Sequence, residues 1–161
     1  MELSQLFIMQ KELDAFIQRN RTDASDVFQE KGLALIVELA ELANETRSFK
    51  FWSTKGPSAK DVILEEYVDS IHFILSLGIE KNLDDMTVWP DGEVNGDLTD
   101  VFLKTTESII HFLKELTVES YESMWIHYGA IAKHLGFSPA QIIEAYILKN
   151  EENYKRQIDG Y

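Results

Sequence analysis

The chain has 161 residues, 45% of them hydrophobic and 27% charged, a composition typical of a globular domain that buries one core. Its net charge of −13 argues against a non-specific nucleic-acid binder, because such a protein needs a basic face. Without cysteine it has no disulfide or thiolate metal site, and no apolar run approaches the ~20 residues of a membrane span. We therefore expect one domain over residues 1–161, in a reducing cytoplasm, without nucleic-acid or membrane partners.

Apolar side chains recur in steps of three and four along most of the chain, which is the spacing of helices. This spacing predicts a first helix over about residues 3–19 and a second that ends near Arg47, after a cap at Ser25 or Asp26. A third helix is expected from a cap at Ser58 to about Ile79. The intervening segment SFKFWSTKGP (residues 48–57) is predicted to be a loop.

The second half of the chain begins with turn signals. Residues 81–96 contain the sequences PDG and NG, which predict a long connection that could serve as a mobile cover or as a partner surface. Helices are expected over about residues 99–116 and 118–135, the second of them stopped by Gly136. A last helix opens at Ser138 and Pro139 and ends near Gln157. The predicted fold class is all-α, a bundle of about five to six helices.

Two acidic pairs lie among apolar neighbours on consecutive predicted helices. Glu38 and Glu41 belong to LIVELAELANE (residues 35–45), and Glu66 and Asp69 belong to the third helix. A spacing of three residues makes both carboxylates of a pair project from one helix face. If the helices pack antiparallel, as a short connection favours, the carboxylates meet and repel one another unless cations neutralise them. Hard divalent ions, Mg²⁺ above all, are the expected partners.

Two other interpretations of the acidic residues remain. Asp69 and His72 are also three residues apart, and such pairs build di-iron centres in four-helix bundles. That architecture needs a second pair of the same kind, whereas Glu107 and His111 are four residues apart, so a di-iron centre is disfavoured. His72 is then expected to support the site or to contact a ligand. Alternatively, the acidic residues form solvated faces of a non-catalytic helical interaction protein.

Three stretches carry a resemblance: ELAELANETRSFKFWS (residues 38–53), EEYVDSIHFILSLG (residues 65–78) and KNEENYKRQ (residues 149–157). They resemble the all-α dimeric dUTPases, which belong to the MazG-like superfamily of nucleoside triphosphate pyrophosphohydrolases. The Glu-x-x-Glu and Glu-x-x-Asp motifs of the superfamily fall on the two acidic pairs, and FKFWS separates the dUTPases from generic MazG-like proteins. The likeness spans nearly the whole chain, although residues 81–98 and 117–135 contribute little specific signal.

The resemblance implies hydrolysis of dUTP to dUMP and pyrophosphate, which limits the incorporation of uracil into DNA. Two or more Mg²⁺ ions, for which Mn²⁺ could substitute, would bridge the triphosphate to the four acidic residues Glu38, Glu41, Glu66 and Asp69. Glu41 is favoured as the carboxylate that orients or deprotonates the attacking water, although spacing alone does not identify the base. The resemblance also implies a homodimer and leaves open whether dUDP is cleaved.

Lys149, Asn153 and Arg156 share one face of the last helix, because they are spaced four and three residues apart. Cations near a helix C-terminus also occur because they stabilise the helix dipole. Since this tail resembles the phosphate-contacting helix of the family, we expect the three residues to bind phosphate oxygens. Lys50, in the loop after the first acidic pair, is a further candidate.

Four residues are candidates for recognition of the base and the sugar. Gln10 occupies a core position of the first helix, where its amide offers a donor and an acceptor to a uracil edge, unless neighbouring backbone satisfies it. Trp52 could stack on the base, Asn44 could hold the substrate, and Phe73 could exclude a 2′-hydroxyl. A MazG-like enzyme that acts on another nucleotide such as dCTP is the nearest alternative, because the carboxylates explain the chemistry without choosing the base.

Overall fold

The computed structural model describes residues 1–23 and 25–160. These residues form six α-helices and no strand beyond an isolated bridge between Glu2 and Val88, which confirms the all-α prediction. The helices are α1 (Ser4–Asn20), α2 (Phe28–Thr46), α3 (Lys60–Glu80), α4 (Leu98–Glu115), α5 (Val118–Leu135) and α6 (Pro139–Ile158). Within the described part of the chain, no helix combines the length and the apolar character that crossing a membrane requires.

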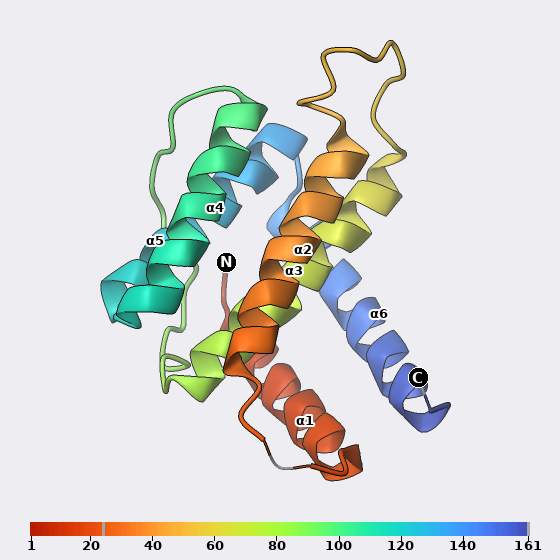
Figure 1. Ribbon diagram of the computed structural model, residues 1–161, viewed down its shortest axis with the longest axis vertical. Coiled ribbons are helices and arrows are strands. Elements are labelled where there is room, and N and C mark those ends of the chain that lie inside the picture. Colours follow the sequence, from red (N-terminus) through yellow and green to blue (C-terminus); the bar gives the residue numbers. More distant parts are fainter. Residues whose placement is uncertain (24, 161) are drawn as a thin grey trace.

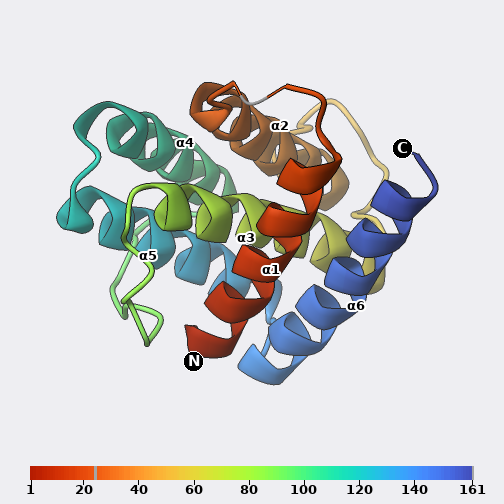
Figure 2. The same cartoon turned by 90° about the horizontal axis from the view of Figure 1, so that it is seen from below.

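Helix α3 occupies the centre of the bundle. It runs antiparallel to α2, with which it packs closely, as the short connection between them predicts (Figure 1). Helices α1 and α6 lie side by side across another face of α3 (Figure 2), and each contacts both the other and α3. One side of α3 thus meets α2, and a neighbouring side meets the α1–α6 pair, which places the polar residues of α3 between four helices.

Helix α5 packs on α3 through large aromatic side chains. The hydroxyl of Tyr121 donates to the backbone oxygen of Ile74 at 2.9 Å, and the hydroxyl of Tyr67 donates to that of Tyr128 at 2.9 Å. These rings and that of Trp125 are fully buried. Burial of such rings is among the largest contributions that single side chains make to a core, so this contact holds α3 rigid behind the polar residues.

The connection between α3 and α4 fastens the N-terminus to the bundle. The amide of Leu3 donates to the oxygen of Thr87 at 2.8 Å, and the amide of Trp89 donates to the oxygen of Met1 at 2.9 Å. The indole nitrogen of Trp89 donates to the backbone oxygen of Trp125 at 2.9 Å. This long loop therefore has a structural role, and it orients the start of α1.

The helix boundaries follow the sequence expectation, but two of the predicted caps do not. Ser58 was expected to cap α3, yet the cap position is Ala59; the Ser58 hydroxyl instead donates to the carboxylate of Glu45, which ties the loop to the end of α2. Helix α2 starts at Phe28 after Val27, and Asp26 contributes only by accepting from the Phe28 amide at 2.9 Å. The predictions at the last two helices are confirmed: Gly136 ends α5 with a φ of 65°, and Ser138 caps α6.

Gly78 offers a test of the contact between α3 and α5. A Cβ atom at this position would lie 2.1 Å from the Tyr121 hydroxyl oxygen and 2.5 Å from its Cζ atom, and the buried ring has no free space to move into. We expect Gly78→Ala to lower the free energy of unfolding by about 1–3 kcal/mol, as overpacking of a core does. Urea denaturation followed by circular dichroism measures it. Gly56→Ala is the control, since nothing lies within 4 Å of that Cβ position, and equal stability of the two variants would refute the prediction.

Candidate active site

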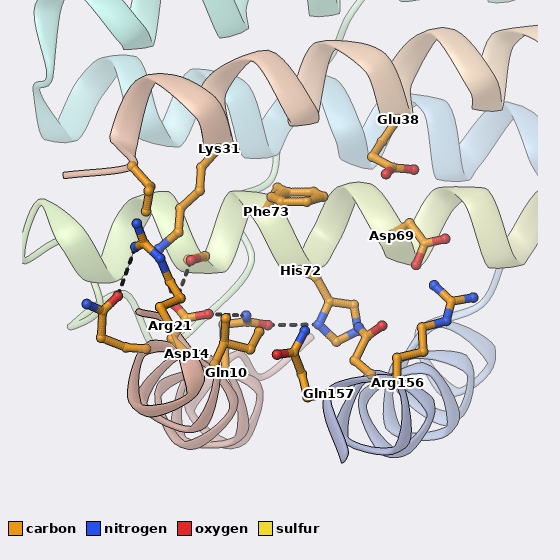
Figure 3. A pocket seen from close by; sticks show the side chains of 15 residues that line it. Gln10, Asp14, Arg21, Lys31, Glu38, Asp69, His72, Phe73, Arg156 and Gln157 are labelled. Carbon is orange, nitrogen blue, oxygen red and sulfur yellow. Dashed lines mark hydrogen bonds and ion pairs between the residues drawn. The ribbon is translucent and has the colours of Figure 1, made fainter. Parts of the chain in front are cut away.

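A cavity of about 430 Å³ opens where α1, α2, α3 and α6 meet (Figure 3). Its volume suits a nucleotide-sized ligand. Each of the four helices contributes side chains, and so does the segment between α1 and α2. The lining residues are Gln10, Asp14, Ile17, Gln18, Arg21, Val27, Lys31, Glu38, Asp69, His72, Phe73, Ser76, Asn153, Arg156 and Gln157.

Three of the four predicted carboxylates converge at one end of this cavity, where Glu38 and Asp69 line it and Glu66 lies beside them outside the lining. Glu38 comes from α2, and Glu66 and Asp69 come from α3; one oxygen of each lies within 4.8 Å of the other two. Glu38 lies three residues after Leu35 and four before Leu42, so it flanks the buried apolar stripe of α2 formed by Leu35, Leu39 and Leu42. Glu41 lies beside this group but is exposed, and it is not one of the three converging side chains.

The convergence changes the proton affinity of these carboxylates. Burial, followed by repulsion from Asp69, Glu41 and Glu66, raises the pKa of Glu38 to about 7. Burial and the negative charges of Asp69 and Glu41 likewise raise the pKa of Glu66. Burial raises the pKa of Asp69, although an ammonium group beside it acts in the other direction. In the absence of cations, part of this group therefore holds protons near neutral pH.

The ammonium group belongs to Lys149, whose side chain is only 7% exposed. Its Nζ atom lies 2.7 Å from Glu65 Oε1 and 2.9 Å from Asp69 Oδ2. Hydrogen bonds to these two carboxylates outweigh burial and raise the pKa of Lys149, so it stays charged. Lys149 is not among the residues that line the cavity, so it acts here as an internal counter-cation. The expected grouping with Asn153 and Arg156 is therefore incomplete in this structure.

Asn153 and Arg156 do line the cavity, one helical turn apart on α6. The Arg156 guanidinium points toward Asp69 in Figure 3, and one of its nitrogens lies 2.6 Å from Glu152 Oε1. The pair places one amide and one cation at the carboxylate end of the cavity. These are groups that bind phosphate oxygens well.

The other end of the cavity holds a buried polar network around Gln10. The amide nitrogen of Gln10 donates to Asp14 at 2.8 Å, and its oxygen lies 2.8 Å from both the Tyr146 hydroxyl and Nδ1 of His72. Phe73 lies between this network and α2, as Figure 3 shows. The placement of Gln10 and Phe73 agrees with the expectation of a base- and sugar-binding region, a role that remains a prediction.

Sequence reasoning missed several residues of this network. Asp14 was detectable, since it lies one turn after Gln10 on the same helix face. Two further residues reach the site from distant parts of the chain, where no local pattern indicates such contacts. They are Lys31, which pairs with Glu80 and lies 3.8 Å from Asp14, and Tyr146. Ser76, whose hydroxyl donates to Asp14 at 2.6 Å, reads as an ordinary small core residue in the sequence.

Six predicted site residues do not line the cavity: Glu41, Glu66 and Lys149, which belong to the carboxylate group or contact it, and Asn44, Lys50 and Trp52, which lie farther along the chain from it. Asn44 is exposed at the end of α2 and accepts a hydrogen bond from Lys50. Trp52 is 65% exposed and packs edge-on against Phe49 and Phe51 in its own loop. Because the loop closes on itself and on the end of α2, it presents neither Lys50 nor Trp52 to the cavity, and Asn44 at that helix end is also outside the lining.

The metal-capable group found among the described residues contains carboxylates only. His72 is occupied with Gln10 through Nδ1, and burial lowers the pKa of His72 to about 3. Glu107 and His111 are both exposed on α4, which does not line the cavity. These positions give no support to a di-iron centre.

Comparison with known proteins agrees with this geometry. A family model described as dUTPase matches residues 2–161, nearly the entire chain, whereas a search of curated proteins finds no match. The family generally uses a divalent metal, and the group formed by Glu38, Glu66 and Asp69 is suited to one. With its all-helical fold and its match over nearly the full length, the chain belongs to the all-α dUTPase family and is a hydrolase with dUTP diphosphatase activity.

Proposed function

We propose that this dUTPase cleaves dUTP to dUMP and pyrophosphate by attack of water on the α-phosphorus, with Mg²⁺ as its cation, and so limits uracil incorporation into DNA. One observation carries the proposal: Glu38 and Asp69, whose carboxylates converge with that of Glu66, line one end of a cavity that extends to a buried amide at Gln10. The triphosphate then lies at the carboxylate end and the uracil lies at the amide end.

The donor set supports a hard divalent ion. Carboxylate oxygens are the ligands that Mg²⁺ and Mn²⁺ prefer, and the group contains neither a histidine nor a sulfur ligand. The ammonium group of Lys149 offsets only part of the negative charge of these carboxylates, and burial disfavours their charged forms. When bound, two or more such ions would neutralise these residues and the triphosphate and would lower the pKa of a nearby water.

The remaining steps belong to side chains of the chain. Glu41 is exposed beside the converging carboxylates, and in this proposal it accepts the proton of the attacking water. Asn153 and Arg156 bind oxygens of the departing pyrophosphate and stabilise the charge that develops on it. Lys149 neutralises Asp69 and Glu65; a phosphate contact by Lys149 would require it to leave both of them. We assign no substrate contact within one subunit to Asn44, Lys50 or Trp52.

We further propose a homodimer that forms through an apolar surface on α2 and α4. We call it the α2–α4 face and define it by Leu33 and Val37 of α2 and Leu103 and Ile110 of α4, all exposed. A groove of about 310 Å³ lies between the same two helices and is lined mainly by apolar side chains. Exposed apolar side chains on two helices that pack together favour an interaction site, and a second copy offers a matching surface by two-fold symmetry.

Loss of one converging carboxylate tests the proposed chemistry. We expect Glu66→Gln and Glu38→Gln to lower kcat/KM for dUTP at least about 100-fold in the presence of Mg²⁺, because each removes a charged ligand from the group. The measurement is release of pyrophosphate with and without Mg²⁺. Asp61→Asn, an exposed carboxylate on the same helix outside the cavity, should retain full activity. The proposal fails if wild type and Glu66→Gln are equally inactive or equally active.

Glu38 should destabilise the ion-free protein as the pH rises. The pKa of Glu38 is about 7 in the folded chain against an ordinary value of 4.5, so the folded state binds the proton more tightly than the unfolded state. The free energy of unfolding therefore falls as the pH rises from about 4.5 to about 7. In EDTA at pH 8 we expect Glu38→Gln to raise Tm by about 2–4 °C. This corresponds to relief of about 1 kcal/mol of destabilisation, the part of the charge repulsion that remains after solvent screening at this half-buried site.

Differential scanning calorimetry at pH 5 and pH 8, with EDTA or with Mg²⁺, measures these shifts. Mg²⁺ should raise the Tm of the wild type at pH 8 and should have little effect on Glu38→Gln. Glu122→Gln, an exposed carboxylate on α5, serves as the control for loss of one negative charge. A lower Tm for Glu38→Gln than for the wild type in EDTA at pH 8 would contradict the assignment of Glu38 to a repulsive, cation-seeking group.

The dimer can be tested on the α2–α4 face. Leu103 is 63% exposed, and we expect Leu103→Glu to shift the protein from dimer to monomer, because it would place two charges in one apolar interface. Size-exclusion chromatography with light scattering measures the mass. Leu148→Glu is a matched control, since Leu148 is 61% exposed on α6, away from this face. A monomeric wild type, or a dimer that survives Leu103→Glu and dissociates with Leu148→Glu, would disprove the proposed interface.

A further inference from the structure

The Gln10 amide is almost completely buried, and its hydrogen bonds are nearly saturated by the protein itself. Its nitrogen donates to Asp14, and its oxygen faces two partners, the Tyr146 hydroxyl and Nδ1 of His72, all at 2.8 Å. Two of these bonds involve helices far away in sequence, α3 and α6, so the orientation of the amide is imposed by the tertiary structure. Figure 3 shows Gln10 between Asp14 and His72.

The neighbours determine which end of the amide is the oxygen. Burial raises the pKa of Asp14, and the Ser76 hydroxyl at 2.6 Å and the Lys31 ammonium at 3.8 Å act in the other direction by favouring the charged form. As a carboxylate, Asp14 accepts on its other oxygen from the N–H side of Gln10.

On the other side of the Gln10 amide, burial lowers the pKa of His72 to about 3, which keeps its ring neutral, and the Gln10 oxygen 2.8 Å from Nδ1 assigns the ring proton to that nitrogen. The Tyr146 hydroxyl is assigned as a donor to the same oxygen at 2.8 Å, since its other acceptor, the backbone oxygen of Leu6, is farther away at 3.4 Å.

Little of the hydrogen-bonding capacity of Gln10 is left over. Both lone pairs of its oxygen are occupied, and one of its two N–H groups is taken by Asp14. No other described residue takes the second N–H group, and Gln10 lines the cavity. Toward a ligand in that cavity the amide can therefore donate and cannot accept.

We propose that Tyr146 is a specificity-determining positioning residue: together with His72 it holds the Gln10 amide as a donor, so that the cavity favours a carbonyl oxygen of uracil over the exocyclic amine of cytosine. The inference rests on the proposed function, since it concerns the base end of the same site. An exocyclic amine would need an acceptor there. Turning the amide to provide one would place its NH₂ group against two buried donors, and unpaired buried polar groups are costly.

Tyr146→Phe tests the proposal because it removes only the hydroxyl. The ring would still stack on His72, where the centroids are 4.1 Å apart and the planes 18° apart. We expect the ratio of kcat/KM for dUTP to that for dCTP to fall about tenfold, the effect of one well-placed buried hydrogen bond. Tyr154→Phe is the control: Tyr154 lies on the same helix, packs on Phe16 and is not part of the cavity lining, so the ratio should not change.

A second pair of variants tests the other donor independently. The side-chain nitrogen of asparagine can replace Nδ1, so His72→Asn should keep the dUTP preference within about twofold, whereas the isosteric His72→Leu should lower it about tenfold. Melting curves of all variants establish that each is folded. A Tyr146→Phe protein that is folded and keeps the wild-type ratio would overturn the proposal.

Binding measurements separate this inference from the proposed function. Calorimetric titration with dUMP and dCMP should show the same loss of preference in Tyr146→Phe without any need for catalysis. If the wild type hydrolyses neither triphosphate but prefers dUMP through Tyr146, the proposed function fails and the inference stands. If the wild type cleaves dUTP and Tyr146→Phe retains the preference in both assays, the inference fails and the function stands. Equal binding of dUMP and dCMP by the wild type also overturns it.

Discussion

Mutual repulsion among half-buried carboxylates is the constraint on which the structure depends. One oxygen of each of Glu38, Glu66 and Asp69 lies within 4.8 Å of the other two, because the buried apolar residues of α2 and α3 hold the two helices together. A solvated helix face would let such side chains separate, and their pKa values would then stay near ordinary ones. Here burial and repulsion raise the pKa of Glu38 to about 7, so the core of the bundle supplies the energy that keeps the carboxylates together.

The rest of the bundle explains how this arrangement is tolerated. Helix α3 is held from behind by the tyrosines that join it to α5, and the α3–α4 loop orients α1 through its contacts with the N-terminus. Helix α6 brings Lys149 to Asp69, which offsets part of the charge while leaving the cavity side open. The packed helices thus surround the group, and Glu38 and Asp69 face the cavity, as in sites where function is obtained at the expense of stability.

Sequence reasoning predicted the parts of this structure that depend on local spacing. The six helices, the cap at Ser138 and the meeting of both acidic motifs follow from periodicity and a short connection. Local spacing could not predict the contacts between side chains of helices that are distant in sequence. Helical spacing placed Lys149 on the face of Asn153 and Arg156, yet the nearby carboxylates of α3 hold its ammonium group away from the cavity. The three aromatic residues of the loop that contains Trp52 are equally consistent with stacking on a base and with packing on one another, and the structure shows the packing.

The two ends of the cavity are built on opposite electrostatic principles. At the carboxylate end, charge is left uncompensated, so the site gains most from a ligand that brings cations with it. At the amide end, Asp14, His72 and Tyr146 occupy all the hydrogen-bonding groups of the Gln10 amide except one N–H. This end can therefore form a further hydrogen bond only with a ligand that offers an acceptor. In the proposed function, a triphosphate with its cations would satisfy the first end whatever its base. Discrimination between bases would then come from the saturated end, where a wrong partner leaves buried polar groups unpaired.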